Sequence, residues 1–166
     1  LGIAIGLGIP FIPGMPLGHE VQAQRLPVRA AQAHVVFASE VRHPVEVGAA
    51  EQQHLVQWLS KRLGTPLRVP VLATEGYELL GGRLLSGPDG PVAQFMYQDG
   101  GGKRLTLYVT GKTQKESTTA FRFAQEGPVS VFYWIDADCC YAITAELGKG
   151  DLARIATTVY QQLETH

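Results

Sequence analysis

The chain has little charge, and the charges it has are evenly balanced. Charged residues make up 17% of its 166 residues, the formal net charge is −1, and no block of like charges occurs. Nucleic-acid binding requires a basic face, so we expect no nucleic-acid partner. Hydrophobic residues make up 45% of the chain, which is enough for a buried core and excludes wholesale disorder. The length suits one domain with an extension.

Cysteine is almost absent, and this excludes a disulfide framework. The two cysteines, Cys139 and Cys140, are adjacent. Neighbouring residues of a strand point to opposite faces, so we expect one thiol to be buried and the other exposed. A strained vicinal disulfide or a thiol sensor is the alternative.

The sequence also lacks the common catalytic and metal-binding motifs. No two of its five histidines are four residues apart, and neither His-Glu-x-x-His nor Gly-x-Ser-x-Gly occurs. Residues 111–113 read Gly-Lys-Thr, but Thr106 stands where a phosphate-binding loop needs its first glycine. Asp136 and Asp138 are explained by a turn between strands. The sequence therefore predicts no enzyme, with no catalytic residue, cofactor or metal site.

The N-terminal stretch, residues 1–18, carries no charge and contains three prolines. Since the first residue is Leu, we expect a processed chain or a fragment, with this stretch as the residual outer end of a transmembrane helix. An irregular apolar arm that packs on its own domain or on a neighbour is the alternative. Residues 19–34 are expected to form a polar linker with a short helix over 28–33, before a domain spanning 35–166.

Two amphipathic helices are predicted. In residues 49–63, Leu55, Leu59 and Leu63 recur at a spacing of four, and Gly64 follows as a stop signal. The second helix begins near Asp151, and its apolar residues recur at helical spacing to residue 163. Each apolar stripe should face a sheet.

Between the helices, apolar and β-branched runs separated by turn residues predict antiparallel strands near 77–85, 92–98, 104–110, 119–124, 129–135 and 141–147. A further extended segment or two is expected in 35–47, at a sheet edge because of Pro44. The fold class is therefore α+β: an antiparallel β-meander of about five to six strands, covered on one face by the two helices. The other face, with Thr106 and Arg122, should meet solvent or a partner.

The strand over 129–135 is apolar on both faces. Such a strand must be covered on both sides, by its own chain, by a second copy or by a partner. It therefore makes a homo-oligomer an alternative to a monomer.

Several segments together resemble the extracytoplasmic part of transmembrane anti-sigma factors of Gram-negative bacteria. The resemblance covers roughly residues 34–163 and rests on seven stretches: 40–47, EVRHPVEV; 54–64, HLVQWLSKRLG; 76–85, GYELLGGRLL; 93–97, AQFMY; 104–109, RLTLYV; 119–123, TAFRF; and 129–134, VSVFYW. This resemblance implies a single-pass inner-membrane regulator whose cytoplasmic domain, absent from this chain, holds a sigma factor. The present domain would then lie in the periplasm and receive a signal.

The resulting hypothesis is an extracytoplasmic sensory or interaction domain of a membrane-bound anti-sigma factor that regulates transcription. A signal would shift its conformation or expose residues 29–34 to a protease. Residues 42–44 and the loop 111–118 are the other segments expected to be exposed. The alternatives are a self-associating structural module of the envelope, and a small thiol enzyme that uses Cys139 or Cys140 with a histidine.

Overall fold

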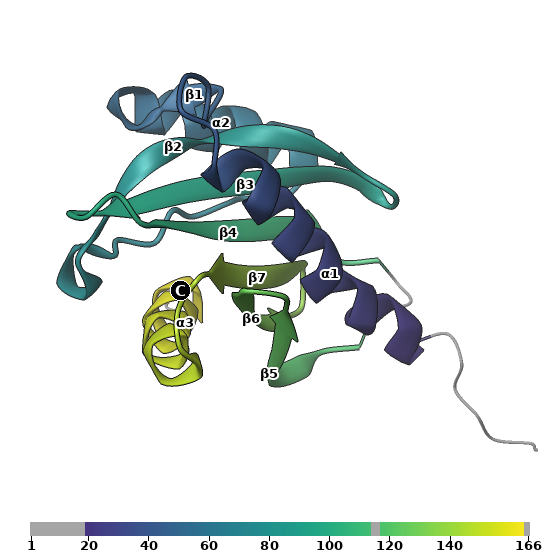
Figure 1. The fold of residues 1–166 in the computed structure, drawn as a ribbon. Helices are drawn as coiled ribbons and strands as arrows, with labels where there is room; N and C mark the ends of the chain where they lie inside the picture. Colours follow the sequence, from purple (N-terminus) through teal and green to yellow (C-terminus); the bar gives the residue numbers. More distant parts are fainter. Residues whose placement is uncertain (1–18, 114–116, 165–166) are drawn as a thin grey trace, which may run out of the picture.

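The computed structural model describes residues 19–113 and 117–164, with side chains from residue 25 onwards. The expected membrane-proximal segment, residues 1–18, lies outside the described residues. The α+β class is confirmed. The described chain holds a seven-stranded antiparallel sheet and three α-helices, where the prediction was five to six strands and two covering helices (Figure 1). The extended segments expected in 35–47 were wrong except at the end: residues 35–38 belong to the helix at 19–38, and the edge strand is only Val47–Gly48.

Along the chain the elements follow in this order: α1 (His19–Ala38), β1 (Val47–Gly48), the 3₁₀ turn η1 (Ala49–Glu51), α2 (Gln52–Leu63), the 3₁₀ turn η2 (Ala73–Glu75), β2 (Tyr77–Gly87), β3 (Gly90–Asp99), β4 (Arg104–Gly111), β5 (Thr119–Glu126), β6 (Val129–Ile135), β7 (Cys139–Ala145) and α3 (Lys149–Glu164).

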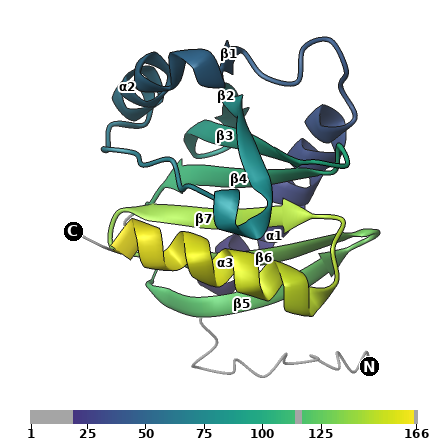
Figure 2. The same ribbon diagram turned by 90° about the vertical axis from the view of Figure 1, so that its left-hand side faces the viewer.

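The sheet is not a simple meander, and this corrects the predicted connectivity. The strand order is β1-β2-β3-β4-β7-β6-β5, so β4 pairs with β7 and β5 lies at the far edge. Short turns join β2, β3 and β4, and again β5, β6 and β7 (Figure 2). The connection after β4 carries the chain past two strand positions, which local turn signals do not reveal.

Helices α2 and α3 cover the same face of the sheet, as predicted (Figure 2). Leu55 and Leu59 of α2 are fully buried against β2 and β3, while Leu152 and Ile155 of α3 are buried over β6 and β7. Gly64 ends α2 in the left-handed conformation with φ 75°, which glycine adopts without strain. The stripes read from the sequence therefore form the main core.

The opposite face is covered by α1, against the expectation that it would meet solvent or a partner. Helix α1 lies obliquely across β4, β7 and β6 (Figure 1) and buries Leu26, Ala30 and Ala31. Thr106 of β4 is fully buried beneath it, and only Arg122 of the two residues expected at this face is exposed. Residues 19–34, predicted as a linker, therefore lie in a helix that forms a third layer of the domain.

The covering of both faces of the sheet also explains why β6 is apolar on both sides. All seven of its residues are buried, so the strand that is apolar on both sides is covered by its own chain: α1 on one face and α3 on the other. β6 is an interior strand with β5 and β7 as neighbours. Self-association through β6 itself is therefore excluded.

Candidate functional site

The C-terminal half of helix α1 is held on the sheet by polar contacts as well as by apolar packing. Near the midpoint of the helix, Arg29 Nη1 lies 3.4 Å from Asp89 Oδ2 in the β2–β3 turn. About one turn before the end of the helix, His34 Nδ1 lies 2.9 Å from Thr106 Oγ1 of β4. We call these contacts, together with those of Arg104 at the C-terminal end of α1, the α1 latch.

Arg104 caps the C-terminal end of α1. Its Nη1 donates to the carbonyl oxygens of Ala38 at 3.0 Å, Phe37 at 3.4 Å and Glu40. The last carbonyls of a helix lack partners within it and carry partial negative charge, so a guanidinium there both donates to them and opposes the dipole. Arg104 Nε also donates to Gln98 Oε1 on β3, at 3.3 Å, which orients the guanidinium.

Arg83 of β2 supports the same end of α1. Its guanidinium carbon lies 3.8 Å from the centroid of the Phe37 ring, and its Nη2 donates to the carbonyl of His43 at 2.6 Å. The chain leaving α1 is therefore tied down as well. Arg42 and His43 are exposed, as expected for that segment, and their backbone N–H groups donate to the Glu40 carboxylate. Those N–H groups lower the pKa of Glu40.

His34 is the most perturbed titratable group of the α1 latch. The ring is only 3% exposed, and burial lowers its pKa to about 4 because the charged form would lose its hydration. It is therefore neutral at neutral pH. Protonation of His34 opposes the docked position of α1, so this contact is sensitive to acid.

The interface beneath α1 is unusually polar for a helix on a sheet. Gln94 of β3 is 1% exposed and Thr144 of β7 is fully buried, and their side chains make no hydrogen bond to any of the residues that the structure describes. Buried polar groups without partners cost free energy, so this face gains less from docking α1 than an apolar face would. The arrangement suits a helix that can be displaced.

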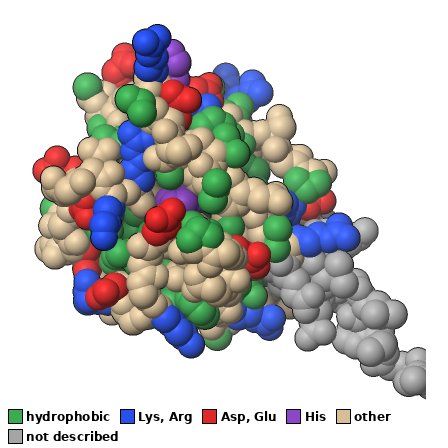
Figure 3. Space-filling model, viewed as in Figure 1, with side chains coloured by type: hydrophobic (Ala, Val, Ile, Leu, Met, Phe, Trp, Pro, Cys, Tyr) green, Lys and Arg blue, Asp and Glu red, His purple; other side chains and the backbone are tan. Residues whose placement is uncertain are grey.

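A groove of about 400 Å³ opens beside the C-terminal end of α1. Its lining includes His34 and Ser39 of the α1 region, Lys103 and Arg104 at the start of β4, and Glu146. Figure 3, which shows the α1 face, has charged side chains of both signs among hydrophobic and neutral ones. The groove therefore exposes one flank of the α1 latch to solvent.

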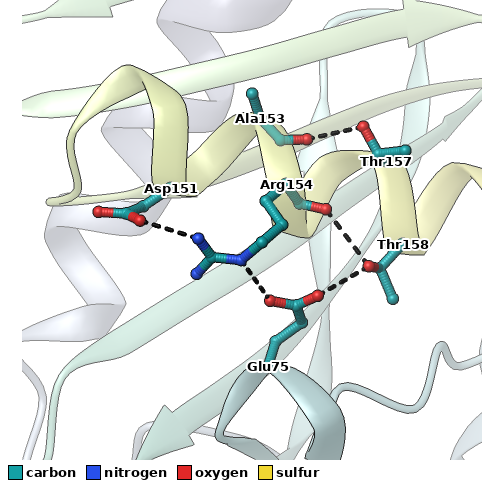
Figure 4. A network of polar contacts seen from close by, with 6 residues as sticks. All are labelled: Glu75, Asp151, Ala153, Arg154, Thr157 and Thr158. Carbon is teal, nitrogen blue, oxygen red and sulfur yellow. Dashed lines mark hydrogen bonds and ion pairs between the residues drawn. The ribbon is translucent and has the colours of Figure 1, made fainter.

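A second polar network, on the opposite side of the sheet from α1, joins η2 to α3. Glu75 of η2 accepts hydrogen bonds from Arg154 Nε and Thr158 Oγ1 of α3, both at 2.9 Å, and Arg154 also pairs with Asp151 (Figure 4). The arginine lowers the pKa of the Glu75 carboxyl. The side chain of Arg154 is well exposed, so this network has the character of a structural contact rather than a reaction centre.

The cysteines are both buried, which corrects the expectation that one would be exposed. Cys139 faces the α2 and α3 layer and Cys140 faces α1, so they do point to opposite faces, but both faces are covered. The two are not joined by a disulfide. Burial raises the pKa of the Cys139 thiol to about 11, which removes the thiolate at neutral pH.

The other segments expected to be exposed lie in different settings. Residues 29–34 lie within α1, where Ala30, Ala31 and His34 are buried, so they do not form an exposed linker. In the loop 111–118 the residues on either side of 114–116 are half-buried or exposed, and 114–116 lie outside the described residues. Asp136 Oδ1 accepts from the backbone N–H groups of Asp138 and Cys139, which confirms the turn role.

Among the described residues, no group of three or more histidines, cysteines or carboxylates is placed to hold a metal ion. None of the described helices combines the length and the apolar character needed to cross a membrane. The site that the structure does build, the α1 latch, was missed from the sequence. The spacing of Leu26, Ala30 and His34 is its one visible signal.

The fold and the α1 latch define an α+β domain in which one helix bridges the sheet. Comparison with known proteins adds no family to this description. No protein family model matches the chain, and no curated protein or solved structure is significantly similar to it.

Proposed function

We propose that this chain is the extracytoplasmic sensory or interaction domain of a membrane-bound anti-sigma factor. The domain would lie in the periplasm, tethered to the inner membrane through its N-terminal end, and a cytoplasmic domain outside this chain would hold the sigma factor. The resemblance of residues 34–163 supports this proposal, and so does the uncharged stretch of residues 1–18.

The observation that carries the proposal is the position of α1. This helix directly follows the uncharged stretch and lies across the sheet, fixed by Arg29, His34 and Arg104. A change in the sheet domain therefore alters the docking of the element nearest the proposed membrane anchor. This is the geometry that a receiver needs to pass a signal toward a membrane.

The mechanism is a shift between two states. In the resting state α1 is docked; in the signalling state it is released, and the residues around 29–34 become accessible to a protease or a partner. A ligand or partner that binds the released state more tightly shifts the population by its differential affinity alone. The polar groups Gln94 and Thr144 gain access to water or a partner in the released state, which offsets part of the cost of releasing α1.

The alternative of a small thiol enzyme is disfavoured by the cysteines. A nucleophilic cysteine is a partly exposed thiolate, whereas Cys139 is buried with a raised pKa and Cys140 is buried beneath α1. The alternative of a self-associating envelope module has a different basis, which is the open sheet edge at β5.

The test is transcription in cells that carry the full-length native gene. Arg104→Ala weakens the α1 latch, and Lys61→Ala changes an exposed residue of α2 as the matched control. We expect sigma-dependent reporter transcription to rise with Arg104→Ala and to stay at the wild-type level with Lys61→Ala. Equal reporter activity in all three strains, at equal protein levels, would overturn the proposal.

A further inference from the structure

Strand β5 forms one edge of the sheet among the described residues. Its only neighbouring strand is β6 (Figure 2). The opposite edge is partly protected: the two-residue β1 pairs with Gly81 and Gly82 of β2, and the Glu46 carboxylate accepts the outward N–H of Leu84 at 3.0 Å. An open edge presents unpaired N–H and C=O groups that another strand can bind.

The two faces of β5 differ in chemistry. On the α3 face, the Phe121 ring contacts Trp134 and Tyr160, both at 4.9 Å between centroids, and remains 36% exposed. On the α1 face lie Arg122, which is exposed, and Glu126, with Ala124 between them. A strand added at this edge would extend both faces and cover part of the Phe121 ring.

The regular part of β5 restricts how a second strand can pair. A bulge lies between Thr119 and Arg122, and the register with β6 is continuous from Arg122 to Glu126. Along an edge strand, only alternate residues point their N–H and C=O groups outward. Two copies of β5 can therefore meet antiparallel only in registers that set residues of the same parity opposite each other.

Charge selects among these registers. Pairing centred on Arg122 sets two arginines directly opposite each other, which is unfavourable. Pairing centred on Ala124 sets Arg122 of each copy opposite Glu126 of the other, and by two-fold symmetry this favourable pair occurs twice. The strand therefore complements itself in one register within its regular part.

We propose that the β5 edge binds a second copy of this chain, antiparallel and centred on Ala124, so that one sheet runs through both copies. The interface uses none of the residues of the α1 latch, so this proposal does not depend on the proposed signalling function. The pairing uses the backbone of β5, the two Arg122–Glu126 pairs and the exposed edge of Phe121.

The test is sedimentation of the full chain over a wide concentration range. We expect a monomer–dimer equilibrium in the wild type. Arg122→Glu and Glu126→Arg each place like charges opposite one another twice, and each should weaken dimerisation at least about tenfold. The double variant Arg122→Glu with Glu126→Arg restores both pairs and should return to the wild-type dissociation constant. A strict monomer at all concentrations, or a double variant as weak as the single variants, would overturn the proposal.

A second measurement fixes the register without depending on charge. In the proposed pairing Ala124 faces Ala124 of the second copy, so Ala124→Cys should form an interchain disulfide under mild oxidation. Gln125→Cys, the matched control, faces Phe123 of the second copy and should not. The wild type gives the background from the buried Cys139 and Cys140. Equal crosslinking at 124 and 125 would contradict the register.

Discussion

Arg104→Ala tests how strongly the α1 latch holds the first helix. The guanidinium of Arg104 donates to the carbonyls of Phe37, Ala38 and Glu40 at the end of α1. A hydrogen bond to a charged group contributes about 1.5–3 kcal/mol, and a cation at a helix C-terminus about 0.3–1 kcal/mol. Because these carbonyls lie near the surface and regain water when the arginine is removed, we expect a loss of about 2 kcal/mol.

The assay is urea denaturation combined with amide hydrogen exchange. With an m value of about 2 kcal/mol/M, a loss of about 2 kcal/mol lowers the midpoint of unfolding by about 1 M. The amides of α1 should exchange about 30-fold faster, since each 1.4 kcal/mol corresponds to a factor of ten. Arg104→Lys should give an intermediate loss, because lysine keeps the charge but lacks the planar fork that reaches several carbonyls.

The control is Lys61→Ala, an exposed substitution on α2 that should change stability by less than about 0.5 kcal/mol. If Arg104→Ala leaves both the midpoint and the exchange of α1 at their wild-type values, the reasoning about the α1 latch is refuted. α1 would then be held by the packing of Leu26, Ala30 and Ala31 alone.

Three other perturbations probe the interior of the domain. The free energy of unfolding of the wild type should fall by about 3 kcal/mol as the pH drops from 6.5 to about 4, because His34 is protonated in the unfolded state but stays neutral in the folded state. His34→Gln should remove this part of the pH profile, measured by denaturation. Leu59→Ala should lower the free energy of unfolding by about 2–5 kcal/mol and Leu59→Met by less than about 1.5 kcal/mol, since the side chain is fully buried; equal losses would contradict the packing. Gly81→Ala should cost at least about 2 kcal/mol in the same assay, because φ is 149° and a Cβ would lie 2.1 Å from the Val47 carbonyl oxygen, whereas Gly100→Ala, with open space around it, should be neutral within about 0.5 kcal/mol.

The elements with strong periodicity could be read from the sequence. The leucines of α2 and the apolar residues of α3 recur at helical spacing and are buried where that pattern places them. The six long strands lie close to where alternating residues and turn signals place them. Local chemistry determines these features, so local patterns reveal them.

Helix α1 could not be read in the same way because its buried stripe is narrow and its residues are small. Leu26, Ala30 and His34 recur at a spacing of four, but alanine and histidine are weak signals of burial. Pro27 lies inside the helix, where it is usually taken as a boundary. The helix is identified by its docking on the sheet, which is a tertiary effect.

The pairing of β4 with β7 was missed for a related reason. Consecutive strands usually pair, so a meander was the simplest reading of the turn signals. The segment between β4 and β5 is long enough for β5 to lie at the far edge of the sheet, and no local sequence signal distinguishes this position from one beside β4. The same choice buries Cys140 beneath α1 and leaves β5 as the open edge.

The central claim is that this domain is a receiver held outside the cytoplasm by an anchor at its N-terminal end. Fusions of reporter proteins after His166 of the full-length native protein test this claim most directly. A phosphatase that folds only in the periplasm should be active there, and a fluorescent protein that matures only in the cytoplasm should be dark. The opposite pattern, an inactive phosphatase fusion and a bright fluorescent one, would contradict the claim.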